Sequence, residues 1–173
     1  MANEIWKLAL RVAYKLMLAY WFIARPTERG VYVAVWCGDR ILMIHNSYKP
    51  QATLPCGGLK RDEDPLEGAV REVREEVGVE LRADQLAFVD DYVSRVEFKT
   101  DLSRVYEVRV DPEPEIRIDG REVISGEFVS YEEARRRDVH RIVRQYFDAC
   151  DQRGGSPTET ESASPEERLG EPQ

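Results

Sequence analysis

A glycine pair followed by a glutamate-rich helical segment constrains this chain more than any other feature. Apolar residues recur at helical spacing over about 65–77 and predict an amphipathic helix with one buried face. The residues of that face are Leu66, Ala69, Val70, Val73 and Val77. Glu72, Glu75 and Glu76 stand at i, i+3 and i+4, so their carboxylates converge on a different face. Gly78 follows the last turn, where a left-handed residue typically ends a helix.

The glutamate cluster predicts a divalent cation site. Like charges within one helical turn repel one another, and a bound cation relieves that repulsion. Carboxylate oxygens are hard ligands that suit Mg²⁺ or Mn²⁺. Gly57 and Gly58 lie just upstream, where the absence of Cβ atoms lets the backbone approach a metal or phosphate. Arg71 stands four residues from both Glu67 and Glu75 and is expected to bridge them. The alternative for such a face is a solvated surface with salt bridges.

The whole segment matches the pattern G-x5-E-x7-R-E-U-x-E-E-x-G-U, in which U is apolar, at every defined position. These positions are Gly57, Glu63, Arg71, Glu72, Val73, Glu75, Glu76, Gly78 and Val79. The pattern is the Nudix box, and over about residues 30–150 the chain resembles Nudix hydrolases. That resemblance implies an α/β fold, an α/β/α sandwich with a mixed β-sheet.

The resemblance also implies hydrolysis of a diphosphate linked to another moiety, usually a nucleoside. Phosphoanhydride cleavage needs cations on the phosphate oxygens and an oriented water. The implied metal ligands, for Mg²⁺ or alternatively Mn²⁺, are Gly57, Glu72, Glu75 and Glu76. The implied catalytic residues are Glu72, Glu75, Glu76 and Glu122. The general base is either Glu72 or Glu122, and the sequence leaves that choice open.

Glu122 is included because residues 120–122, followed by 127–130, resemble a MutT-type pattern in which an acidic residue precedes an aromatic-bearing strand. In that pattern the acid faces the Nudix helix from a loop. The alternative is a solvated loop glutamate. Glu63 and Arg71 are expected to orient the ligands rather than to react.

Substrate identity is less constrained. Signatures of the ADP-ribose, dinucleoside-polyphosphate, coenzyme A and NADH types are absent, so elimination favours a MutT-like nucleoside triphosphate pyrophosphohydrolase. Lys49, Lys60 and Arg61 are candidate phosphate partners, and no substrate-binding residue is assigned. The alternative function is a non-catalytic Nudix-fold module that binds a nucleotide or regulates, although the complete set of box glutamates favours an enzyme.

The remaining pattern predicts a Nudix domain over 28–150. A hairpin of strands 31–36 and 40–45 precedes the box, and strands at 86–96 and 104–110 follow it. Short strands at 116–118 and 127–129 lead into a final helix over about 131–150, with a break near Asp138. Residues 151–173 are rich in Ser, Glu, Gly and Pro and are predicted to be disordered.

Residues 1–27 form a separate element, an apolar N-terminal helix over about 4–25. Lys7, Arg11 and Lys15 fall one above another and form a narrow basic stripe. These charges interrupt the apolar run, which argues against a membrane span. Two placements remain open. The helix packs on the domain or across a homodimer interface, or it lies on an anionic membrane with the basic stripe toward the headgroups.

Charge and cysteine content limit the partners and the compartment. The chain has 173 residues with 33 Asp and Glu against 25 Lys and Arg, a formal net charge of −8. This balance argues against a sequence-specific nucleic-acid binder. The resemblance implies a nucleotide or another diphosphate-containing small molecule as the partner. Three cysteines without a CxxC spacing favour a reducing environment, so we expect a cytoplasmic protein.

Overall fold

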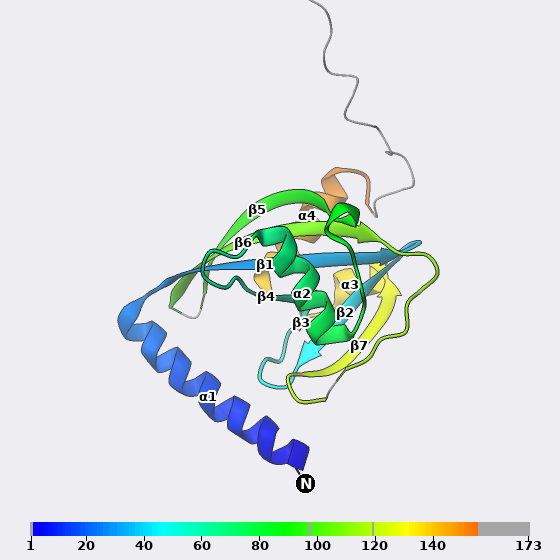
Figure 1. The fold of residues 1–173 in the computed structure, drawn as a ribbon. Helices are drawn as coiled ribbons and strands as arrows, with labels where there is room; N and C mark the ends of the chain where they lie inside the picture. Colours follow the sequence, from blue (N-terminus) through cyan, green and yellow to red (C-terminus); the bar gives the residue numbers. More distant parts are fainter. Residues whose placement is uncertain (1, 97, 119, 156–173) are drawn as a thin grey trace, which may run out of the picture.

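A computed structural model describes residues 2–96, 98–118 and 120–155 (Figure 1). Its elements in chain order are α1 (Ala2–Ala24), β1 (Thr27–Cys37), β2 (Arg40–Asn46), β3 (Ala52–Thr53), β4 (Cys56–Gly58), α2 (Pro65–Val77), η1 (Ala83–Gln85), β5 (Ala87–Val96), β6 (Lys99–Arg109), β7 (Val123–Ser130), α3 (Tyr131–Arg136) and α4 (Arg141–Gln152). The predicted disordered segment lies outside the described residues except for 151–155, where α4 ends.

The strands form one mixed sheet in the order β3-β2-β1-β6-β5, with β4 beside β1 and β7 beside β2. β1 and β6 run parallel, from the pair Thr27 and Thr100 to the pair Trp36 and Arg109. All other pairings between strands are antiparallel, including the predicted β1–β2 hairpin. The long parallel pair places β1 in the middle of the sheet. Each of its two faces must therefore be covered by a separate layer of the fold.

Successive side chains of β1 point alternately into the two cores that lie on either side of the sheet. Val31 and Val33 point into one core together with Val73 of α2. Ala34 and Trp36 point into the other, against α4. Because successive strand side chains point to opposite faces, this run builds a helix–sheet–helix sandwich (Figure 1). The predicted α/β/α sandwich with a mixed sheet is confirmed.

Three details of the predicted elements are wrong. The strand predicted at 127–129 is β7, which begins earlier, at Val123. Residues 116–118 are not a strand; Ile116 and Ile118 pack on the first core, while their backbone lies outside the sheet. β6 begins at Lys99 rather than at 104, because it follows β1 along most of its length. The predicted break near Asp138 is present and separates α3 from α4.

α1 is a single helix that contacts the domain with one face only. Trp21 is 4% exposed, and the Lys99 ammonium lies 4.2 Å from the centre of its ring. Arg11 Nε donates to the Ser47 carbonyl at 3.2 Å, so one member of the predicted basic stripe contacts the domain. Among the described residues, no helix has the length and apolar character needed to cross a membrane.

Candidate active site

Local signals set the bounds of α2. The Asp64 side chain accepts from the amides of Leu66 at 2.8 Å and Glu67 at 3.4 Å, and Pro65 occupies the first turn. At the other end Gly78 adopts φ 69°, and its amide donates to the Arg74 carbonyl at 3.0 Å. These caps satisfy backbone groups that a helix leaves unpaired at its ends. Burial of Ala69, Val73 and Val77 in the core fixes the rotation of the helix, and therefore the direction of its glutamates.

The glycine pair lies directly beneath those glutamates. β4 pairs with Gly30–Tyr32 of β1 and lies against α2. A Cβ atom added at Gly57 would lie 2.1 Å from Cδ of Glu72. No other residue fits there without displacing the carboxylate, so the requirement for glycine is steric.

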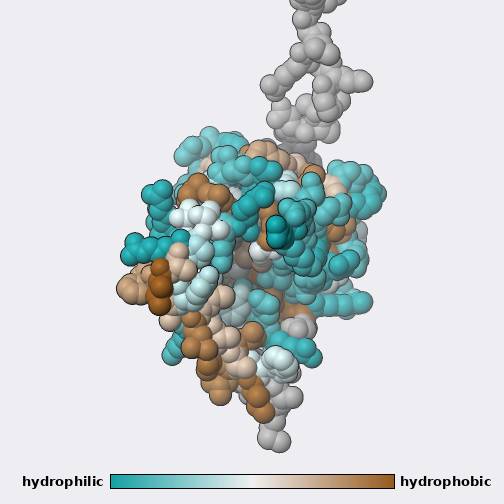
Figure 2. All heavy atoms as spheres, turned by 60° about the vertical axis from the view of Figure 1, so that its left-hand side comes forward, coloured by the Kyte–Doolittle hydropathy of each residue, from teal (hydrophilic) through white to brown (hydrophobic). Residues whose placement is uncertain are grey.

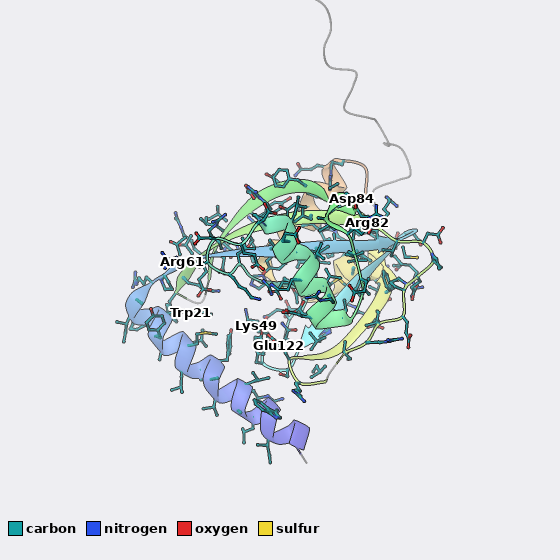
Figure 3. All side chains as sticks on the ribbon, in the orientation of Figure 1. Trp21, Lys49, Arg61, Arg82, Asp84 and Glu122 are labelled. Atoms are coloured by element: carbon teal, nitrogen blue, oxygen red, sulfur yellow. The ribbon has the colours of Figure 1, made fainter. Side chains whose placement is uncertain are left out.

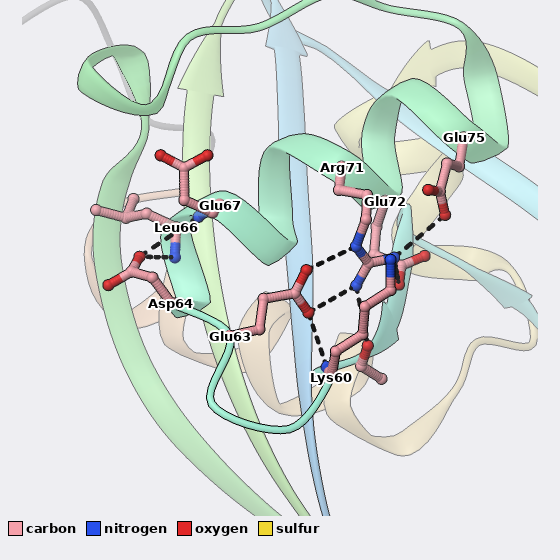
Figure 4. Close-up of polar contacts among 9 residues, drawn as sticks. Lys60, Glu63, Asp64, Leu66, Glu67, Arg71, Glu72 and Glu75 are labelled. Atoms are coloured by element: carbon pink, nitrogen blue, oxygen red, sulfur yellow. Dashed lines mark hydrogen bonds and ion pairs between the residues drawn. The ribbon is translucent and has the colours of Figure 1, made fainter.

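Arg71 organises the carboxylates around it (Figure 4). Its guanidinium donates to both oxygens of Glu63, at 2.7 and 2.9 Å. Glu63 also accepts from the Lys60 amide at 2.7 Å. These bonds, that of Arg71 above all, lower the pKa of Glu63 to about 2. Glu63 therefore anchors Arg71 as a charged, bidentate partner.

The same guanidinium holds two box glutamates. Nη1 donates to Oε1 of Glu72 at 2.6 Å and to Oε2 of Glu75 at 3.1 Å, which leaves the second oxygen of each for another ligand. The expected bridge from Arg71 to Glu67 is wrong in part. Arg71 does reach Glu75, but its other contacts go to Glu63 and the Gly58 carbonyl, and Figure 4 shows Glu67 beside Asp64 at the start of the helix.

Glu76 is the most buried acid of the cluster, with 9% exposure. Its Oε2 accepts from the Cys56 amide at 2.8 Å. Burial raises the pKa of Glu76 well above its ordinary value, and the charges of Glu72 and Glu122 raise it further. The pKa of Glu72 is raised for the same first reason, burial. Crowded, partly desolvated carboxylates of this kind are stabilised by a cation.

Glu122 lies just before β7, and its charge is close enough to add to the effect of burial in raising the pKa of Glu72 and Glu76. It lines the same cleft as Glu72 and Glu75, and Tyr48 donates its hydroxyl to Oε1 of Glu122 at 2.9 Å. Burial, and then the Glu122 charge, raise the pKa of Tyr48, which keeps the hydroxyl protonated as a donor. The sequence did not identify Tyr48; its signal would have been a tyrosine just after a strand that borders the box.

The donor set fits a divalent cation. Among the described residues no three acidic, histidine or cysteine side chains form a ready-made metal cage, because Arg71 and the Cys56 amide hold Glu72, Glu75 and Glu76. The chemistry nevertheless suits Mg²⁺ or Mn²⁺: oxygen donors, mutual repulsion, and a glycine floor that a Cβ would fill. The ligand assignment stays a prediction on these grounds.

Comparison with known proteins agrees with this geometry. A family model described as the NUDIX domain matches residues 26–150. The chain belongs to the Nudix family. The predicted assignment to Nudix hydrolases is thereby confirmed, and the match covers every site residue described above. A search of curated protein sequences gave no match.

Solved structures share the Nudix fold at low identity. The MutT protein from Methanosarcina mazei Go1 has a TM-score of 0.63 at 21% identity, over 76% of this chain and 97% of that one. The Nudix domain of Shewanella oneidensis NrtR, complexed with ADP ribose, has a TM-score of 0.64 at 14% identity, over 73% and 88%.

A third neighbour is larger than this chain. The bifunctional NMN adenylyltransferase/ADP ribose pyrophosphatase from Francisella tularensis, complexed with AMP and a Mn ion, has a TM-score of 0.65 at 20% identity. The match covers 84% of this chain and 48% of that one. A MutT/nudix family protein from Enterococcus faecalis is likewise covered over only 44% of its length.

In this Nudix protein, α1 forms one wall of the cleft. The cleft has a volume of about 570 Å³ and lies between the inner face of α1 and the box. Figure 3 shows Lys49 and Glu122 between α1 and α2, with Trp21 on the helix side. The α1 residues that line it are Leu10, Ala13, Tyr14, Met17 and Trp21. Packing of this helix on the domain was one of the placements left open by the sequence, but its position beside the box was not predicted.

The residues predicted as candidate phosphate partners lie in different surroundings in the structure. Lys49 lines the cleft, 5.6 Å from the centre of the Tyr14 ring. Arg61 has a side-chain exposure of 96% and pairs with Asp62 at 3.7 Å, away from the carboxylates. Asn46 also lines the cleft, and its buried Oδ1 has no hydrogen-bond partner among the described residues. Lys49 and Asn46 are two of the polar residues that line the cleft.

Proposed function

We propose that this protein is a divalent-cation-dependent pyrophosphohydrolase of nucleoside-diphosphate-linked substrates, with nucleoside triphosphates as its MutT-like substrates and Mg²⁺ as its cation. One observation carries the proposal. Glu72, Glu75 and Glu122 line one cleft together with Gly57, Glu76 is buried close enough for burial and their charges to raise its pKa, and Arg71 binds Glu72 and Glu75.

The chain's own residues divide the work. Glu72, Glu75, Glu76 and the Gly57 carbonyl would hold Mg²⁺, which when bound neutralises phosphate charge and acidifies a water. Arg71, fixed by Glu63, keeps Glu72 and Glu75 pointing into the cleft.

Proton transfer is assigned to the facing acid. Glu122, held by the Tyr48 hydroxyl, stands where a carboxylate can accept a proton from an attacking water. Lys49 lies at the same end of the cleft and is placed to contact phosphate oxygens. Glu72 is the alternative base, as the sequence already left open.

The size of the cleft and the neighbouring structures direct the choice of substrates. A cleft of about 570 Å³ lies within the range that holds a nucleotide-sized ligand. One neighbour is named a MutT protein, and the MutT-like resemblance of this sequence favours nucleoside triphosphates as the substrates. ADP-ribose is the second candidate because two neighbours carry that compound in their names.

The test is product release from a panel of nucleotides with Mg²⁺, comparing wild type with Glu75→Gln. The panel holds canonical and oxidised nucleoside triphosphates, ADP-ribose and dinucleoside polyphosphates. We expect turnover of one class and its loss in the variant. Glu80→Gln, the same change at an exposed position of the box region, is the matched control and keeps wild-type turnover.

Metal binding supplies a second readout. Saturating Mg²⁺ is expected to raise the unfolding temperature by about 5–10 °C, since a ligand at a hundred times its dissociation constant adds about 2.7 kcal/mol. The double variant Glu72→Gln/Glu76→Gln is expected to lose that shift. Nucleotide binding without turnover by wild type would instead identify a non-catalytic binding module.

A further inference from the structure

α1 has two apolar faces, and only one of them is used by the domain. The inner face carries Tyr14 and Trp21, which contact the domain and line the cleft. The opposite face carries a second apolar row, all of it exposed. Its members are Ile5, Leu8, Val12, Leu16 and Ile23. We call this row the outer stripe, and Figure 2 shows it as a brown band along the helix.

Helical geometry makes the outer stripe continuous. Spacings of three, four, four and seven residues keep all five side chains on one side of the helix. Exposure reaches 69% at Ile5 and 83% at Ile23, the two ends of the stripe. An uninterrupted apolar band of this length is rare on a surface that faces only water and marks a contact site.

The apolar surface continues onto the domain. Phe22 of α1 packs edge-on against Phe98 in the β5–β6 turn, with ring centres 5.0 Å apart. Both rings are more than half exposed. Tyr20 is exposed along the helix beside the stripe, whereas Trp6 lies nearer the inner face, with the Arg121 guanidinium 5.9 Å from the centre of its ring. Aromatic side chains at the border of an apolar face are typical of helices that lie at a membrane interface.

The charge of α1 indicates which partner covers the outer stripe. Residues 2–25 carry four basic residues, Lys7, Arg11, Lys15 and Arg25, against one acidic residue, Glu4, within a chain of net charge −8. Lys15 and Arg25 are exposed. A second copy seated on the stripe would bring two positively charged helices together, which is unfavourable. An anionic lipid surface complements both the apolar row and the positive charge.

We propose that α1 binds the surface of an anionic bilayer through the outer stripe and lies in the interface plane without crossing it. Because the stripe and the cleft occupy opposite faces of α1, binding leaves the inner wall of the cleft in place. Basic side chains contact headgroups from the flanks of the stripe, a placement different from the Arg11-centred stripe that the sequence suggested.

The test is sedimentation of the full chain with vesicles. We compare phosphatidylcholine alone with an equimolar mixture of phosphatidylcholine and phosphatidylglycerol. Wild type is expected to sediment with the anionic vesicles. Leu8→Glu/Leu16→Glu is expected to weaken binding by about tenfold or more, because the inserted carboxylates oppose burial in the bilayer.

The control is Phe88→Glu/Ile124→Glu, which makes the same charge change at exposed apolar positions of β5 and β7. It is expected to bind as wild type does, and thermal unfolding verifies that both variants fold. Equal binding by the two variants, or no binding by wild type, would overturn the proposal. So would a wild-type dimer in light scattering that Leu8→Glu/Leu16→Glu converts to monomer, because a second copy would then cover the stripe.

Discussion

The two long helices of this protein solve the burial of apolar residues differently. α2 has one apolar face, and Ala69, Val73 and Val77 on it are fully buried against the sheet. α1 is apolar on two opposite faces; the inner one borders the cleft and the outer one stays exposed. When a helix has a single apolar face, the sequence predicts that this face packs against the rest of the domain. The sequence makes no such prediction for a helix with two apolar faces, because periodicity cannot say which face meets the domain.

The largest expected effect lies on the polar face of α2. Glu76→Gln is expected to lower kcat/KM by about 10²–10⁴-fold, because it removes a charge from the proposed cation site. Stability of the metal-free protein is expected to hold or rise, since burial already raises the pKa of Glu76 and the charged form is unfavourable there. Steady-state kinetics and thermal unfolding measure the two effects.

Glu67→Gln is the control on the same helix. Glu67 lies at the start of α2, beside Asp64 and away from the Arg71 network (Figure 4). The substitution is chemically the same as Glu76→Gln, but Glu67 lies outside the carboxylate cluster. Unchanged activity is therefore expected. Equal losses in the two variants would mean that the helix as a whole, rather than the carboxylate cluster, is responsible.

A matched pair of Val→Ala variants compares the two helices directly. Val73 in α2 is fully buried, whereas Val12 in α1 is 51% exposed. Val73→Ala is expected to cost roughly 2 kcal/mol of unfolding free energy, and Val12→Ala no more than about 0.5 kcal/mol. Urea unfolding measures both. A comparable loss at Val12 would show that its side chain is covered in solution.

The inner face of α1 predicts a smaller, kinetic effect. Tyr14 lines the cleft with its ring 5.4 Å from that of Tyr48, so Tyr14→Leu is expected to raise KM about three- to tenfold with kcat nearly unchanged. Leu16→Ala, two residues away on the outer stripe, is expected to leave both constants unchanged. If Tyr14→Leu changes nothing, α1 is no wall of the working site.

The smallest effect is a pH dependence at Glu63. Its pKa is about 2 in the folded protein against an ordinary value of 4.5, so the charged form stabilises the fold above pH 4.5. That stabilisation is lost as the pH falls from 4.5 toward 2. The stability difference between wild type and Glu63→Gln is therefore expected to shrink over this range in urea unfolding. A constant difference would mean that the ion pair with Arg71 is not responsible.

The box was predictable because its signals are local. Apolar spacing predicted α2 over 65–77, and Gly78 was placed correctly as its last cap. The mixed sheet, the hairpin and the break between α3 and α4 were confirmed as well. Glu122 lies 46 positions beyond Glu76, and only the family pattern indicated that it would face the box.

Other contacts depended on distant partners. Arg71 was expected to reach Glu67, one helical turn away, but it takes Glu63 from the preceding loop as a bidentate partner. Residues 116–118 have strand-like composition, yet their backbone lies outside the sheet while their isoleucines fill the core beneath. Local composition does not predict which ion-pair partner or which packing surface the fold brings close to a residue.

The sequence by itself determined the box, its capped helix and the spacing of its carboxylates, because residues within one or two helical turns are positioned by backbone geometry alone. Tertiary structure alone decided that α1 walls the cleft, that Arg11 faces Ser47, and that the outer stripe stays exposed. Those outcomes depend on which surface the domain offers to a helix with two apolar faces. That surface exists only after strands far apart in the chain have come together.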